Sequence, residues 1–399
     1  MSLRTVRALR AVLRPRLRTA FVVAAASLSV LVPAGAGTAA APGPSDDRAL
    51  QRQIDRFVGE PGGPPGIIAL LRNGWESRVL RAGVADLATG RRPHVTDHMR
   101  IASVAKAFSG AVALTLVDRG ALDLDDTLSE RLPNLPEDWG SVTLRQLLNH
   151  TSGLPDYTQD PEFIAVFTAD PRHHFDSRRL LDWVADEPLR FAPGSRYEYS
   201  NSDNIAVALM AEAVTRTPYE QLLRRLVYRP LEMRDTSLPQ GIRIPEPFLH
   251  GYDMSDPDSP EDISEAVSAS GVWASGGIIS TPADLTRFIR GYAKGALYGR
   301  AVVREQRQWI PGAASQPAGP GHNSGGLAIF RYETRCGVVL GHTGNFPGYT
   351  QLAVATPDGS RSMTFSVTSQ INEDTDPARL ARLRAIQENF VCALLRDGR

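Results

Sequence analysis

The stretch Ser103-Val104-Ala105-Lys106 opens a run of small and apolar residues that continues to Gly120. A run with so little polar surface predicts a buried helix, and Gly120 is a typical helix end. Ser103 and Lys106 are one turn apart, so they share a face of this helix. An amine in that position can accept the proton of the serine hydroxyl and make it a nucleophile. The sequence therefore predicts an acyl-transfer centre at the start of a core helix.

The choice of lysine at position 106 supports this interpretation. The chain has 44 basic residues, of which only Lys106 and Lys294 are lysines and the rest are arginines. A buried lysine can lose its proton near neutral pH, whereas a guanidinium effectively cannot. We therefore expect Lys106 to exchange protons in the reaction and Lys294 to be a surface charge.

The first forty residues have the pattern of a signal peptide. Six arginines without an acidic residue precede an apolar run at residues 20–32, and small residues at 38–41 offer a cleavage site. The apolar run has thirteen residues, fewer than the roughly twenty that a membrane-spanning helix needs. We expect residues 1–40 to be removed and the protein to be secreted without stable membrane insertion; a retained anchor is the alternative.

Charge and motif content narrow the classes of partner. Without residues 1–40 the chain carries 38 basic and 44 acidic residues, a net charge of −6. This balance argues against a nucleic-acid or anionic-membrane partner. The sequence contains no HExxH and no paired CxxC pattern, so we expect neither a metal nor a cofactor.

Strand signals at both ends of the chain enclose a mainly helical middle. Asn73-Gly74 predicts a β-hairpin, and an amphipathic helix starts near Pro377. This order favours an α/β fold, in which residues 48–121 and 269–399 form an antiparallel sheet flanked by N- and C-terminal helices. Residues 122–268 are then an inserted, mostly helical domain. The strands are expected at residues 67–71, 78–84, 276–280, 327–332, 337–342, 351–355 and 362–368.

Two further motifs carry polar groups suited to acyl transfer. Tyr199-Ser200-Asn201 lies in a loop before a helix, and His342-Thr343-Gly344 ends a strand. With the Ser103 motif, they resemble the three signatures of the penicillin-recognising serine enzymes: D,D-peptidases, class C-type β-lactamases and related esterases. Residues 147–154 and 275–285 also resemble this family, and the likeness covers roughly residues 66–392. It implies a β-lactamase/transpeptidase-like fold.

The resemblance implies a role for each motif residue. Ser103 is the nucleophile, and the catalytic set adds Lys106, Tyr199 and His342. Tyr199 is the expected proton carrier, so its pKa must be lowered by cationic Lys106 and His342. The charge of His342 is expected to vary near pH 6.5. The expected substrate-binding residues are Asn201, Thr343, Gly344, Asn345, Trp273 and Arg331.

These binding roles differ in kind. Asn345 supplies a main-chain N–H to the oxyanion, beside that of Ser103, and the Thr343 hydroxyl serves a substrate carboxylate. Trp273 is either an aromatic wall of the cleft or an ordinary core residue. Arg331 is a candidate cation for a terminal carboxylate, although strand alternation can instead turn Phe330 inward.

Cys336 and Cys392 are the only cysteines, and an oxidising compartment lets them pair. Cys336 lies in an expected strand, and Cys392 near the end of the last helix. The apolar stripe of that helix places Cys392 on the opposite side, so the predicted disulfide requires the helix to end or distort there.

We expect a secreted, penicillin-sensitive serine D,D-carboxypeptidase that cleaves cell-wall peptides ending in D-Ala-D-Ala through an acyl-enzyme on Ser103. His342 favours the peptidase and esterase branches, because many β-lactamases of the family have lysine there. A β-lactamase or esterase, acting on a β-lactam or ester, is the alternative. A binding protein that has lost catalysis is a third class. The motifs argue against it, because every motif position carries a chemically competent residue.

Overall fold

The computed structural model describes residues 45–396, so the predicted signal peptide at residues 1–40 lies outside the described part. The described residues form one compact unit, and their division into an α/β and a helical domain stays a prediction. Among the described helices, none combines the length and the apolar character needed to cross a membrane.

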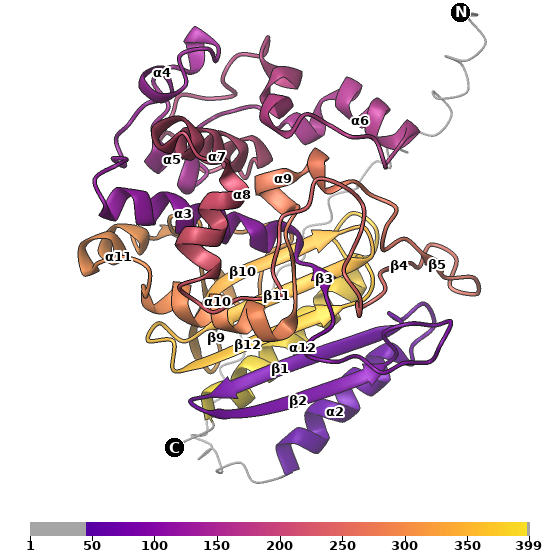
Figure 1. Ribbon diagram of the computed structural model, residues 1–399. Helices are drawn as coiled ribbons and strands as arrows, with labels where there is room; N and C mark the ends of the chain where they lie inside the picture. Colours follow the sequence, from indigo (N-terminus) through magenta and orange to yellow (C-terminus); the bar gives the residue numbers. More distant parts are fainter. Residues whose placement is uncertain (1–44, 397–399) are drawn as a thin grey trace, which may run out of the picture. The chain divides into compact units, whose positions relative to one another are not determined.

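The described strands build one eight-stranded antiparallel sheet in the order β2-β1-β12-β11-β10-β9-β8-β7 (Figure 1). Ile67 of β1 pairs with Val367 of β12, which confirms that both ends of the chain share the sheet. The strands are β1 (Gly66–Asn73), β2 (Glu76–Gly83), β7 (Ile310–Pro311), β8 (His322–Gly325), β9 (Phe330–Thr334), β10 (Gly337–Phe346), β11 (Tyr349–Ala355) and β12 (Arg361–Val367).

Some strand predictions were wrong in extent. β10 runs on to Phe346, so the third motif lies inside the strand rather than at its end. β7 and β8 were missed because their surroundings are rich in glycine and proline. Residues 276–280 yield only β6 (Ile279–Ser280), which pairs with β3 (Met99–Arg100) in a separate ribbon. A second ribbon joins β4 (Tyr252–Asp253) and β5 (Glu261–Asp262).

Helices cover both faces of the sheet (Figure 1). α2 (Ser45–Val58) and α12 (Pro377–Arg396) pack on one face, and α10 (Pro282–Lys294) packs on the other. α3 (Ala105–Asp118) lies between the sheet and the helical region, and each of its residues from Ala105 to Leu116 is buried. The predicted core helix is therefore confirmed.

The helical region packs around α7 (Asn201–Thr215), which contacts α3 directly. The Thr143 side chain caps α5 (Leu144–Leu148) in a reciprocal arrangement with Gln146. The other described α-helices are α4 (Leu128–Arg131), α6 (Pro161–Ala169), α8 (Tyr219–Leu222), α9 (Trp273–Gly276) and α11 (Arg300–Gln306). The described 3₁₀ helices are η1 (Ala102–Val104), η2 (Glu137–Trp139), η3 (Tyr157–Gln159), η4 (Ser177–Val184) and η6 (Ala269–Gly271), and η5 (Leu223–Tyr228) is a π-helix.

The predicted disulfide joins Cys336 and Cys392, whose Cα atoms are 5.2 Å apart. Two details of the prediction were wrong. Cys336 lies in the turn between β9 and β10, and α12 continues past Cys392 to Arg396. No distortion is required because the last part of α12 is buried on several sides: Val391, Cys392, Ala393 and Leu394 are all buried in succession.

Candidate active site

Ser103 lies in the turn η1, immediately before α3, and lines a cleft of about 650 Å³. The helix proper begins at Ala105, two residues later than the sequence suggests. Ala102, next to the serine, has a φ of +51°, a conformation that non-glycine residues adopt rarely and at a cost. The main-chain amide of Ser103 thus stands at the entrance to a helix, where developing negative charge is favoured.

Lys106 is buried beneath Ser103. Its Nζ lies 3.2 Å from Ser103 Oγ, 2.7 Å from Asn201 Oδ1 and 2.9 Å from the main-chain oxygen of Ser275. Burial lowers the pKa of Lys106 to about 7, against the opposing effect of Asp156 and Asp203. The neutral amine is therefore well populated at physiological pH, as the sequence predicts.

The three contacts also fix the direction of the amine's lone pair. A neutral amine has two N–H donors, and two acceptors, Asn201 Oδ1 and Ser275 O, lie within hydrogen-bond distance. The remaining direction leads to Ser103 Oγ. The geometry is therefore suited to removing the serine proton.

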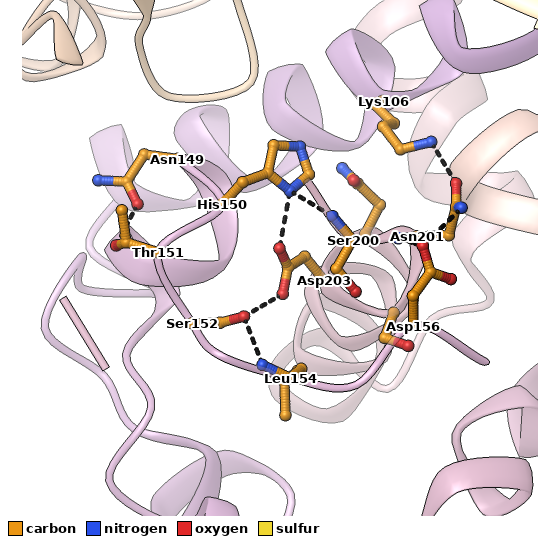
Figure 2. Close-up of polar contacts among 12 residues, drawn as sticks. Lys106, Asn149, His150, Thr151, Ser152, Leu154, Asp156, Ser200, Asn201 and Asp203 are labelled. Carbon is orange, nitrogen blue, oxygen red and sulfur yellow. Dashed lines mark hydrogen bonds and ion pairs between the residues drawn. The ribbon is translucent and has the colours of Figure 1, made fainter. Parts of the chain in front are cut away.

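Asn201, the first residue of α7, is itself held by a carboxylate. Its Nδ2 donates to Asp156 Oδ2 at 2.9 Å and to Thr158 Oγ1 at 3.0 Å, and its main-chain N–H donates to the same Asp156 oxygen (Figure 2). These bonds turn the amide so that Oδ1 faces Lys106. Asp156 was not predicted as a site residue, although it follows the family-like stretch at residues 147–154 by two positions.

Tyr199 lines the cleft beside the nucleophile, with its ring centroid 5.0 Å from Lys106 Nζ. Burial raises the pKa of Tyr199, and the adjacent Ser103 hydroxyl offsets this only in part. The expectation that neighbouring cations lower this pKa was wrong, because desolvation is the largest effect and the carboxylates of Asp156 and Asp203 raise the pKa further. Lys106, and not Tyr199, therefore has a pKa suited to a general base at neutral pH.

His342 is wholly buried on β10, and its Nδ1 is 2.6 Å from the main-chain oxygen of Thr343. Burial lowers the pKa of His342 to about 3. The expectation of a charge that varies near pH 6.5 was therefore wrong. His342 is neutral over the physiological range and does not supply a cation to Tyr199.

β10 approaches the nucleophile through Gly344. A Cβ at this position lies only 2.4 Å from the main-chain oxygen of Ile101, so only glycine allows the strand so close to η1. The pairing of β9 with β10 stops at Gly341, whereas β10 pairs with β11 as far as Phe346. On the β9 side, residues 342–346 of β10 thus pair with none of the described strands.

Asn345 of this stretch lines the cleft, and its side chain turns to the far side of β10. Its Nδ2 donates to Thr350 Oγ1 and to the main-chain oxygen of Ile371, and its Oδ1 accepts from Gln370. The side chain is therefore occupied, which leaves the main chain of Asn345 for the predicted oxyanion role.

Four predicted substrate contacts are absent from the described cleft lining: Thr343, Gly344, Trp273 and Arg331. Trp273 has an exposure of 0%, and its Nε1 donates to Glu220, so the core alternative is correct. Arg331 forms an ion pair with Glu333 at 2.9 Å and is absent from the described cleft lining. Strand alternation instead turns Phe330 inward, with its ring centroid 5.0 Å from that of His342.

A buried hydrogen-bonded network centred on His150 and Asp203 lies next to Tyr199. His150 Nδ1 lies 2.7 Å from Asp203 Oδ2, and the other oxygen of Asp203 accepts from Ser152 (Figure 2). The centroid of the His150 ring lies 4.5 Å from that of the Tyr199 ring. Burial lowers the pKa of His150 to about 3 and raises that of Asp203. The network joins the 147–154 stretch to α7 and supports the second motif.

The described residues offer no group of three or more His, Cys, Asp or Glu side chains that could hold a metal ion. The site consists of a serine, a deprotonatable amine, a phenol and two main-chain amides, which is a set suited to acyl transfer.

Comparison with known proteins agrees with this geometry. The profile of the Beta-lactamase family matches residues 50–388. The chain belongs to the beta-lactamase family. It has the β-lactamase/transpeptidase-like fold, and within the family it resembles both peptidases and amidases.

Among curated relatives, Penicillin-binding protein 4* of Bacillus subtilis is 27% identical over 74% of this chain and 65% of that protein. The D-alanyl-D-alanine-carboxypeptidase/endopeptidase AmpH of Escherichia coli is 30% identical over 64% of this chain and 66% of that protein. The chain thus spans about two thirds of the length of these relatives.

Among solved structures, a D-stereospecific amidohydrolase from Streptomyces is 28% identical with a TM-score of 0.73, covering 85% of this chain and 98% of that one. The D-amino acid amidase of Ochrobactrum anthropi has a TM-score of 0.76 at 23% identity, covering 87% and 98%, and shows likeness of fold.

Proposed function

We propose that this beta-lactamase family member is a secreted serine hydrolase that cleaves amide bonds of D-configured residues through an acyl-enzyme on Ser103. The observation that carries the proposal is the position of Lys106, whose amine lies 3.2 Å from Ser103 Oγ with its two donors directed elsewhere. Secretion rests on the signal-peptide pattern of residues 1–40.

The proposed reaction has two symmetrical halves. Neutral Lys106 takes the Ser103 proton, and Oγ forms a bond to the carbonyl carbon while the carbonyl electrons move to oxygen. The main-chain amides of Ser103 and Asn345 stabilise this oxyanion, a contribution of roughly 3–4 kcal/mol for each such donor. The carbon–nitrogen bond then breaks, and the leaving amine receives the proton, with the protonated Tyr199 phenol in position to relay it. Water repeats the sequence on the ester and frees Ser103.

The preference for D-configured substrates is supported by the named activities of relatives. AmpH, at 30% identity, is a D-alanyl-D-alanine carboxypeptidase and endopeptidase, and the Streptomyces structure, at 28% identity, is a D-stereospecific amidohydrolase. The narrower D,D-carboxypeptidase activity on cell-wall peptides is a second candidate. It needs a cation for the terminal carboxylate, and Arg331 does not provide one.

A β-lactamase or esterase on the same fold differs in the fate of the acyl-enzyme. A penicillin-sensitive peptidase keeps the penicilloyl group on Ser103, whereas a β-lactamase releases it rapidly.

The test is a time course of intact-protein mass spectra after addition of penicillin, beside turnover of a D-amino acid amide and its L-enantiomer. We expect one slowly released adduct on the wild type, none on Ser103→Ala, and turnover of the D-amide. Labelling of Ser103→Ala, or equal rates for both enantiomers, contradicts the proposal. Rapid loss of the adduct with turnover of a cephalosporin favours the β-lactamase.

A further inference from the structure

We infer that the cleft excludes a free carboxylate next to the scissile bond, so that the substrates are amides, esters or longer peptides rather than peptides ending in a free D-residue. The inference rests on the proposed function and specifies its leaving group. Two independent features carry it: a strap over Thr343 and the charge of the cleft rim.

The strap consists of residues 312–318, between β7 and β8, and several of its residues line the cleft. Ser315 Oγ lies 2.6 Å from Thr343 Oγ1, and the Thr343 hydroxyl donates to the main-chain oxygen of Pro317 at 2.8 Å. At its other side, the main-chain oxygen of Ala314 accepts a hydrogen bond from the Tyr197 hydroxyl at 2.5 Å. The strap is therefore anchored to both β10 and the helical region.

These contacts use up the hydroxyl that was expected to bind a substrate carboxylate. A threonine has one O–H donor, and that of Thr343 is directed to Pro317. Ser315 and Thr343 have exposures of 2% and 0%, so neither meets a ligand without displacing the strap. An incoming carboxylate finds this donor already bound.

The charge of the rim acts in the same direction. Of the described residues that line the cleft, none is Lys or Arg, and the charged ones are Glu373 and Asp374. Both are exposed on the loop between β12 and α12. A carboxylate brought beside them meets like charge without a compensating partner, which is unfavourable.

This acidic loop is tied to the third motif. Gln370 donates to Asn345 Oδ1, and Asn345 Nδ2 donates to the main-chain oxygen of Ile371 at 2.7 Å. These bonds hold the start of the loop against Asn345, whose main chain is assigned to the oxyanion.

Two arginines on neighbouring elements do not alter this balance. Arg331 is paired with Glu333. Arg384 of α12 interacts electrostatically with Glu373, and its Nη1 donates to Gln387, whereas its Nε and Nη2 atoms are buried without a hydrogen-bond partner among the described residues. Neither guanidinium is among the residues that line the described cleft.

The test compares two peptides that differ in one group: an N-acetylated peptide ending in D-Ala-D-Ala with a free carboxylate, and the same peptide as its C-terminal amide. We expect the wild type to cleave the D-Ala–D-Ala bond of the amide with a kcat/KM at least about tenfold higher than that for the free acid. Glu373→Lys should narrow this ratio by adding a cation, and Ser315→Ala by loosening the strap. Glu261→Lys, an equal charge change on exposed β5, should leave it unchanged.

Equal rates on the two peptides, or faster cleavage of the free acid, overturn the inference. A preference for the amide that neither Glu373→Lys nor Ser315→Ala reduces also overturns it, because other residues then make the selection. If neither peptide is cleaved and penicillin does not label Ser103, the proposed function fails instead, so the two failures are distinguishable.

Discussion

The amine of Lys106 is closer to Asn201 Oδ1, at 2.7 Å, than to Ser103 Oγ, at 3.2 Å. Asn201 therefore orients the amine for the serine, and Asp156 in turn orients Asn201. The nucleophile depends on a chain of contacts that starts in the helical region and ends at the first turn of α3.

Lys106→Arg should lower the rate of Ser103 acylation by at least about a hundredfold although the charge is kept, since a guanidinium cannot accept the proton. The measurement is the acylation rate with penicillin or a D-amide. Lys294→Arg is the matched control, because Lys294 is the only other lysine and is exposed at the end of α10. Wild-type rates in Lys106→Arg contradict the assignment of the base.

The rate of acylation should rise with pH and level off above an apparent pKa of about 7, because the active form is the neutral amine. His342→Gln should leave the position of this limb unchanged, since the pKa of His342 is lowered to about 3 and the ring does not titrate there. A limb that disappears in His342→Gln assigns the titration to the histidine instead.

Asp156→Asn should shift the rising limb of the pH–rate profile of acylation to lower pH. The Asp156 carboxylate raises the pKa of Lys106, so its removal lowers that pKa and populates the neutral amine at more acidic pH. The midpoint of the pH–rate profile is the measurement, because the absolute rate also responds to the loss of the Asn201 contact. A shift to higher pH contradicts the electrostatic role.

Gly344→Ala should lower both stability and activity, since the new methyl group meets the main-chain oxygen of Ile101 at 2.4 Å. Overpacking of this kind costs about 1–3 kcal/mol in the free energy of unfolding. Gly241→Ala is the control: a Cβ there has no atom within 4 Å. Equal denaturation midpoints for the two variants contradict the close approach of β10.

Replacing both Cys336 and Cys392 by Ala should lower the free energy of unfolding by about 4 kcal/mol, as the bridge joins residues 56 positions apart. Denaturant titration measures the loss. The rate of acylation of the folded variant should be unchanged, because the bridge lies outside the described cleft lining. An unchanged midpoint means that the bridge does not constrain the unfolded chain.

The sequence determined the parts of this protein that depend on local pattern. The apolar run after Ser103 identified the core helix, the spacing of Ser103 and Lys106 placed amine and hydroxyl on one face, and Asn73-Gly74 gave the hairpin. Lysine in an arginine-rich chain pointed to proton exchange, and the burial of Lys106 lowers its pKa accordingly.

Tertiary packing decided what depends on contacts between distant segments. Desolvation raises the pKa of Tyr199 and lowers that of His342, contrary to the predictions. The sequence could not show this, because the atoms that exclude water from a side chain come from distant segments of the chain. Two hydrogen bonds between distant segments could not be predicted for the same reason. Thr343 bonds to Pro317 of the strap, 26 residues away, and Asn201 bonds to Asp156, 45 residues away. The sequence identifies the functional groups of the site. The fold decides which of them are uncharged and which already have a hydrogen-bond partner.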